Sequence, residues 1–229
     1  MDLVEDADEP MNELGPYDIA DAPAGVERLD LGSLHVPAVK DVEIRVQAGE
    51  DGVVQQVVLV NGDSALQLGV FAAPRTAGIW DEVRAEIKST LFADGVAVEE
   101  GDGDYGAELR ARVRTPEGLT DLRFIGVDGP RWMIRAVFQG PAALDPGVAT
   151  PLVDCLHGLV VDRGKEAMPV REALPLRLPK DVAEQAAEQA AEKAQLEAGE
   201  TAAAGPKATN GTKPSSSRRR PSPRPRRSG

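Results

Sequence analysis

The sequence predicts an α+β fold: a twisted antiparallel sheet of about six or seven strands with two helices packed on one face, flanked by disordered tails. Three observations predict it. Segments in which apolar and polar residues alternate recur through the middle of the chain, separated by short turn-forming sequences. Two other segments carry the longer period of an amphipathic helix. Both ends are polar and lack any period.

The first strands are expected between residues 28 and 71. RLDLGSLHVP begins the ordered region and suggests an irregular strand. VEIRV then alternates strictly, with Val42, Ile44 and Val46 on one face. GEDG turns the chain into VVQQVVLV, and the tight turn at residues 61–63 leads into ALQLGVF. These segments predict neighbouring antiparallel strands.

The period changes in TAGIWDEVRAEIKSTLFADG, which predicts a helix of about four turns. Thr76 is available as its N-cap and Gly95 as its C-terminal stop. The apolar residues recur every four positions: Ile79, Val83, Ile87 and Leu91.

The second half of the sheet is expected in VAVEE, AELRARVR, LTDLRFIGV and RWMIRAVF, where the short connections TPEG and DGP indicate a meander. A second helix is predicted over residues 148–162, with Gly164 past its end. Prolines at 169, 175 and 179 then favour an extended segment.

The domain organisation follows from these segments. We expect a disordered acidic arm at 1–27, a single α+β domain at 28–179, a solvated helix at 180–199 and a disordered basic tail at 200–229. Eight of the 26 basic residues and none of the 38 acidic residues lie beyond residue 200, so residues 1–200 carry a balance of −20. An acidic body of this kind repels nucleic acid at long range.

The composition also predicts the compartment. The acidic N-terminus is unlike a signal peptide, and no window approaches the ~20 apolar residues that cross a bilayer. Cys155 is the single cysteine, which excludes an internal disulfide and fits a reducing compartment. We expect a cytoplasmic protein that does not insert into membranes.

Four segments together resemble a known family: RLDLGSLHVP, LGVFAAPRTAGIWDEVRAEI, GVDGPRWMIRAVFQGPAA and MPVREALPLRLP. The chain resembles DUF3710, an uncharacterised family of actinobacteria, over nearly all of the predicted core. The resemblance implies a bacterial cytoplasmic origin and a single domain. It brings no activity, cofactor or catalytic residue with it.

GDGDYG, at residues 101–106, matches the glycine spacing of a nucleotide-binding loop. A strand follows it where that loop needs a helix, and Asp102 and Asp104 would repel a pyrophosphate. The segment also lacks the closing Glu of a calcium loop. We therefore predict an acidic turn, and assign no cofactor and no metal ligands.

Two further clusters suggest chemistry only weakly. Cys155 and His157 stand two positions apart, which on a helix turns them about 200° away from each other, so a buried inert thiol is expected. Glu82 and Glu86 share one helix face and are expected to be solvated. With no catalytic residues assigned, the sequence favours a protein that is not an enzyme.

The arginines of three neighbouring predicted strands form the most informative pattern. If Leu109, Phe124 and Trp132 each face the core, the alternation places six arginines on one outer face, defined here as the predicted arginine face. A solvated or internally neutralised face is the competing interpretation. The six residues are Arg110, Arg112, Arg114, Arg123, Arg131 and Arg135.

The leading functional hypothesis is a non-catalytic interaction or regulatory module that binds an acidic partner protein or an anion through this face. Two alternatives stay open. A nucleic-acid-associated protein would use the basic tail at 205–229 for weak binding. A small-ligand binder or enzyme would need a pocket that the sequence does not reveal. The partner and the oligomeric state are left open.

Overall fold

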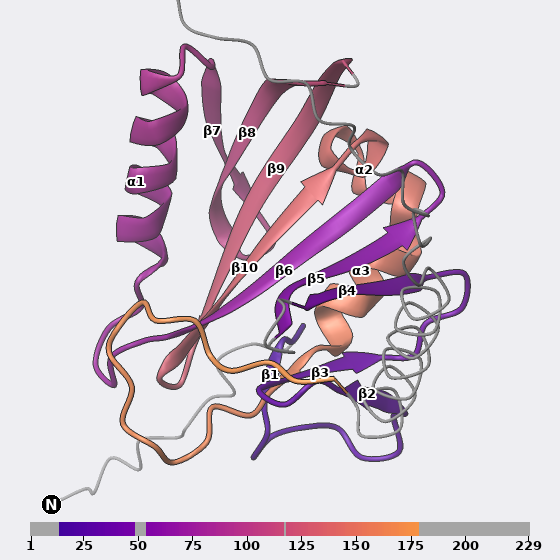
Figure 1. Ribbon diagram of the computed structural model, residues 1–229, viewed down its shortest axis with the longest axis vertical. Helices are drawn as coiled ribbons and strands as arrows, with labels where there is room; N and C mark the ends of the chain where they lie inside the picture. Colours follow the sequence, from indigo (N-terminus) through magenta and orange to yellow (C-terminus); the bar gives the residue numbers. More distant parts are fainter. Residues whose placement is uncertain (1–13, 49–53, 117, 179–229) are drawn as a thin grey trace, which may run out of the picture. The chain divides into compact units, whose positions relative to one another are not determined.

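A seven-stranded antiparallel sheet dominates the fold, in the order β4-β5-β6-β10-β9-β8-β7 (Figure 1). The computed structural model describes residues 14–48, 54–116 and 118–178. Two meanders, β4 to β6 and β7 to β10, are joined where β6 pairs with β10. The predicted α+β fold with an antiparallel sheet is therefore confirmed. The strands are β4 (Glu43–Ala48), β5 (Val54–Asn61), β6 (Ser64–Ala72), β7 (Val98–Gly103), β8 (Gly106–Thr115), β9 (Gly118–Gly129) and β10 (Trp132–Gln139).

A second, four-stranded sheet has the order β1-β11-β3-β2. Its strands are β1 (Tyr17–Asp18), β2 (Arg28–Asp30), β3 (Leu34–Pro37) and β11 (Val160–Val161). β1 lies within the residues expected to be a disordered arm, so that prediction is wrong for residues 14–27. The ordering has a physical cause: the backbone N–H of Tyr17 donates to the carbonyl of Leu159 at 2.9 Å, and Asp18 accepts from the indole Nε1 of Trp132 at 2.9 Å.

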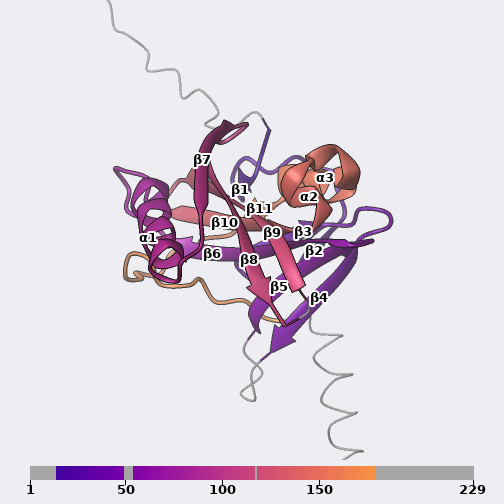
Figure 2. The ribbon, with the colours of Figure 1, turned by 90° about the horizontal axis from the view of Figure 1, so that it is seen from above.

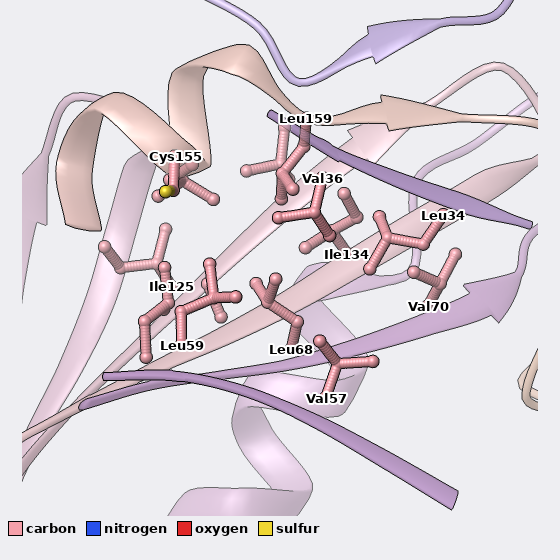
Figure 3. Packing of buried hydrophobic residues seen from close by; sticks show 14 of the residues in the cluster. Leu34, Val36, Val57, Leu59, Leu68, Val70, Ile125, Ile134, Cys155 and Leu159 are labelled. Carbon is pink, nitrogen blue, oxygen red and sulfur yellow. The ribbon is translucent and has the colours of Figure 1, made fainter. Parts of the chain in front are cut away.

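The main core lies between the two sheets and α3 (Thr150–Gly158). Strict alternation along β6 buries every second residue from Ser64 to Ala72 on this side. Figure 3 shows side chains of β3, β5, β6 and β10 packing together beneath Cys155 and Leu159. The core is built mostly from Val, Leu and Ile, as the composition indicates.

The helices lie on opposite faces of the large sheet (Figures 1 and 2). A Cβ atom added at Gly126 of β9 would collide with the Trp80 ring of α1 (Trp80–Ala93), whereas the preceding residue, Ile125, packs in the core that contains α3. These two sides are called the α1 face and the α3 face below. The expected placement of both helices on one face is therefore wrong, because each face carries enough apolar residues to hold its own helix.

The second predicted helix is also divided and shorter. The chain forms α2 (Pro141–Leu144), a 3₁₀ turn (Pro146–Ala149) and then α3, which ends at Gly158. The residues after it pair as β11 with β1 and β3, since an extended backbone there completes the small sheet. The C-terminal segment up to residue 178 contains no helix, as its prolines predict; it turns at residues 170–171 and forms isolated β-bridges at Ala173 and Leu176. The predicted helix at 180–199 and basic tail at 200–229 lie outside the described residues.

Within the part of the chain that the structure describes, no helix is both long and apolar enough to cross a membrane.

Asp128 of β9 begins α1 from outside the helix, so the predicted cap at Thr76 is wrong. Its Oδ1 accepts from the backbone N–H of Ile79 at 2.8 Å and its Oδ2 from that of Trp80 at 3.1 Å. No side chain of the adjoining segment caps the helix. The carboxylate therefore satisfies two amides at a helix start and also ties the helix to the sheet.

We expect Asp128→Ala to lower the free energy of unfolding by about 1–2 kcal/mol, because both amides lose their acceptor. Asp128→Asn keeps one acceptor oxygen, so it should lower the free energy of unfolding by less than half as much as Asp128→Ala does. Urea denaturation of both variants measures the difference. An alanine variant as stable as the wild type would show that the cap contributes nothing.

Candidate functional site

Glu108 neutralises two of the six predicted arginines. The β8–β9 register sets Arg110 directly opposite Arg123, so both lie on the α3 face beside Glu108. The Glu108 Oε1 accepts from Arg110 Nη2 at 2.8 Å, and its Oε2 accepts from Arg123 Nε at 2.8 Å. Glu108 and Arg123 are both buried, with side chains 2% and 8% exposed. Gly103 makes room, because a Cβ atom there would lie 2.3 Å from the same carboxylate.

Arg112 is paired in the same way one step along the strand. It stands opposite Asp121 and donates two bonds, Nε to Oδ1 at 2.7 Å and Nη2 to Oδ2 at 2.8 Å. The guanidinium lowers the pKa of Asp121 through this bidentate hydrogen bond. Arg112 itself is exposed, so the pair contributes little stability but leaves little free charge.

The predicted arginine face is divided by the true register. Phe138 of β10 pairs with Arg123, which leaves Arg135 opposite Gly126 and therefore on the α1 face. Arg131 lies in the β9–β10 turn with a φ of 66°. Arg114 is exposed at the far end of β8. The prediction of six arginines on one face is therefore wrong.

The error has a physical cause in β9 and β8. Because both faces of the sheet are covered, apolar residues occur at both parities of β9: Phe124 is half-buried on the α1 face and Ile125 is buried on the α3 face. Leu109 of β8 is buried on the α1 face, whereas Trp132 of β10 is buried on the α3 face. A single inward side for all three strands does not exist.

Arg135 has a different environment from the paired arginines. It is flanked on both neighbouring strands by glycines, Gly69 and Gly126, so no Cβ atom stands beside it. Its guanidinium carbon lies 5.3 Å from the centre of the Phe71 ring. Its Nε is buried and makes no hydrogen bond within the described residues. Burial lowers its pKa, and no acidic group among the described residues counteracts that shift.

A cavity of about 410 Å³ opens beside Arg135. It forms where β5 and the end of β6 are bordered by the C-terminal segment, whose Leu174 N–H donates to the Val70 carbonyl at 2.9 Å. Apolar side chains and glutamine amides share the lining, and Arg135 is the sole ionisable group in it among the residues that the structure describes. The lining residues are Gln47, Val54, Gln56, Gln67, Leu68, Gly69, Val70, Phe71, Arg135, Ala173, Leu174 and Leu176.

Arg171 holds the C-terminal segment (orange in Figure 1) against α1. It donates to Glu86 at 2.6 Å and to Glu82 at 2.7 Å, and its own N–H bonds to the carbonyl of Ala72 at 2.8 Å. The two carboxylates expected to be simply solvated are thus ion-paired across 85 residues or more of sequence. This pairing fixes the segment that forms one wall of the cavity.

The other candidate motifs form no reactive centre. Cys155 is fully buried in the main core, and burial raises the pKa of its thiol to about 12, as expected of an inert cysteine. The GDGDYG segment is the β7–β8 hairpin, with Asp104 and Tyr105 in its turn, so the predicted turn is confirmed. The Tyr105 and His157 rings lie 6.2 Å apart, away from the Arg135 cavity.

Sequence reasoning missed the cavity, although a signal for it was present. Glycine inside a strand weakens the strand and often marks a close approach of another group. Gly69 and Gly126 both interrupt otherwise apolar strand segments. Only the pairing of both with one residue, Arg135, shows that they flank the same side chain.

Comparisons with known proteins show the family of the chain. A solved structure from Bacteroides thetaiotaomicron shares 15% identity at a TM-score of 0.38 and covers 60% of this chain, which spans about half (48%) of that protein. The solution structure of cyanobacterial PsbP (CyanoP) from Synechocystis sp. PCC 6803 shares 13% identity at a TM-score of 0.35, covering 62% of this chain and 95% of its own. Likenesses this weak carry no argument about fold or function. No curated protein sequence matches the chain. Residues 15–185 match the family described as Protein of unknown function (DUF3710), and the chain therefore belongs to this family.

Proposed function

We propose that this protein is a non-catalytic cytoplasmic binding module that takes an acidic group of a ligand or partner into the Arg135 cavity. One observation carries the proposal: Arg135 is a half-buried cation whose neighbours within the described residues include no carboxylate. Its single cysteine is consistent with the proposed compartment.

The contrast with Arg123 supports this choice of site. Moving a cation out of water costs free energy unless an anion compensates it. Glu108 supplies that anion for Arg123 within the chain. Arg135 has only the ring of Phe71, which compensates a small part of the cost. An anion from outside the chain would therefore bind at Arg135 with a favourable change in electrostatic free energy.

The lining supports binding rather than catalysis. Apart from Arg135, the cavity is formed by aliphatic, aromatic, glycine and glutamine residues. None of these residue types acts as a nucleophile or as a general acid or base at neutral pH. A pocket with apolar walls and one placed charge is typical of a ligand-binding site.

The proposal predicts that anions stabilise the protein through Arg135. A panel of sulfate, phosphate, acetate and benzoate, each tested up to a concentration that saturates its effect, should contain at least one anion that raises Tm by about 3–6 °C at tenfold its Kd. Arg135→Gln should abolish this increase. Differential scanning fluorimetry at constant ionic strength measures it.

Arg112→Gln is the matched control, because it removes the same charge from an exposed, internally paired arginine. It should keep the full anion response, which also separates binding from the general stabilising effect of sulfate. Without added anion, Arg135→Gln should unfold at or above the wild-type Tm, since an uncompensated buried charge is removed. Equal anion responses of the wild type and Arg135→Gln would contradict the proposal.

A further inference from the structure

One row of residues crosses the large sheet and forms the base of the Arg135 cavity. Gln47 pairs with Gln56, the β5–β6 register places Gln56 beside Gly69, and Gly69 pairs with Arg135. Paired residues of neighbouring strands project from the same face. The row therefore sets two amides and one guanidinium on the α1 face, with Gly69 between them.

The charge of this row selects the class of anion. Phosphate sites usually combine several cationic or backbone N–H donors, often at a helix N-terminus. Here one arginine is the only charged residue of the described lining, and each of these lining residues lies on a strand or on the C-terminal segment. One guanidinium compensates one negative charge, and its planar pair of donors matches the two oxygens of a carboxylate.

The walls of the cavity require an apolar body on the same ligand. Leu174 and Leu176 line its edge but are already buried in the main core, so the apolar surface that a ligand can cover is the half-buried Phe71 ring, which lies over the guanidinium. The same ring covers Gly69, since an added Cβ atom would meet Phe71 at 3.0 Å and Arg135 Nη2 at 3.8 Å. A flat or branched hydrocarbon group placed against this ring would exclude water from it and strengthen the ion pair beside it.

Gln67 provides a directed donor next to this body. Its Oε1 already accepts from Gln139 Nε2 at 3.3 Å, which leaves its own amide Nε2 for the cavity. Gln67 lies two residues before Gly69 on the same face of β6. The amide is therefore placed to donate to a carboxylate oxygen or to another acceptor on the ligand.

We propose that the ligand is a small monocarboxylate with an aromatic or branched aliphatic body, bound with its carboxylate on Arg135 and its body against Phe71. The inference rests on the proposed function and adds the chemical class of ligand to it.

Titration of the full-length protein with four probes tests the proposal: benzoate, acetate, phosphate and benzamide. Benzoate should bind about tenfold or more tightly than acetate, which lacks the apolar body, and than phosphate, which has the wrong charge and shape. Benzamide keeps the ring without the charge and should bind about tenfold or more weakly than benzoate. NMR titration of the amide resonances gives each Kd and locates the binding site.

Variants separate the two parts of the ligand. Arg135→Gln should abolish benzoate binding, and Arg135→Lys should weaken it because a point charge replaces the two-donor fork. Gly69→Ala displaces the Phe71 ring without changing any charge, so it should weaken benzoate several-fold and leave acetate unchanged. Arg112→Gln, the exposed control, should bind all four probes as the wild type does.

The outcomes distinguish the two proposals. Phosphate or acetate binding as tightly as benzoate, with loss in Arg135→Gln, would retain the anion-binding function and overturn the carboxylate class with its apolar body. Benzamide binding as tightly as benzoate would overturn the role of the charge. No binding of any anion, together with no anion response in Tm, would overturn both proposals.

Discussion

Glu108→Ala is expected to lower the free energy of unfolding by about 3–5 kcal/mol. The variant leaves Arg123 buried without a counter-ion, since that guanidinium bonds only to Glu108 among the side chains that the structure describes. Arg110 also loses its partner, but it is half-exposed and water replaces the lost bonds. Unfolding in urea or guanidinium chloride, followed by circular dichroism, measures the decrease in the free energy of unfolding.

A double variant separates the charge imbalance from the loss of packing. Replacing both members, with Glu108→Met and Arg123→Leu, removes the two buried charges together and fills similar volume. Such replacements are often neutral or stabilising, so the double variant should lie within about 1 kcal/mol of the wild type. If it is as unstable as Glu108→Ala, packing at this site matters more than charge. If Glu108→Ala itself costs under about 1 kcal/mol, the buried pair is not a determinant of stability.

Gly126→Ala is expected to lower the free energy of unfolding by about 3 kcal/mol or more, because a Cβ atom at this position would lie 2.0 Å from the Trp80 ring. The Trp80 ring is held in place, since its Nε1 donates to the carbonyl of Ala107 at 2.7 Å. Accepting the methyl group therefore requires α1 to move away from β9. The free energy of unfolding should fall, and the fluorescence of Trp80 should change as its environment opens.

Gly101→Ala is the matched control for this overpacking. Gly101 also lies in a strand of the large sheet, but nothing stands within 4 Å of a Cβ atom added there. Its substitution should be neutral or slightly stabilising, through the lower entropy of the unfolded chain. If Gly126→Ala lowers the free energy of unfolding no more than Gly101→Ala does, α1 is not packed closely on β9.

Much of the secondary structure could be predicted because local patterns determine it. The alternation along β6 and the four-residue spacing from Ile79 to Leu91 are strong periodic signals, and both elements form as expected. Helix ends are weaker signals. Gly95 ends α1 with a φ of 75°, as predicted, whereas the start depends on Asp128, which lies 48 residues beyond Trp80.

The candidate site was predicted only in part. Arg135 is among the six arginines that alternation selects, but the residues that make it distinct, Gly69, Phe71 and Leu174, come from β6 and from a segment nearly 40 residues further along the chain. Its apparent companions Arg110, Arg112 and Arg123 are compensated by carboxylates on the same two strands. Charge counts along one strand do not show which charges meet across a sheet.

The sequence by itself therefore determined the α+β class, the strands of both meanders, the amphipathic α1 and the inert character of Cys155, because each depends on periods or composition that neighbouring residues carry. Only the tertiary structure decided which face each strand residue occupies. A strand with apolar residues at both parities fits either orientation until its partners are known, and a shift of one residue exchanges the two faces. That register separates Arg135 from the paired arginines and leaves its charge beside an apolar cavity.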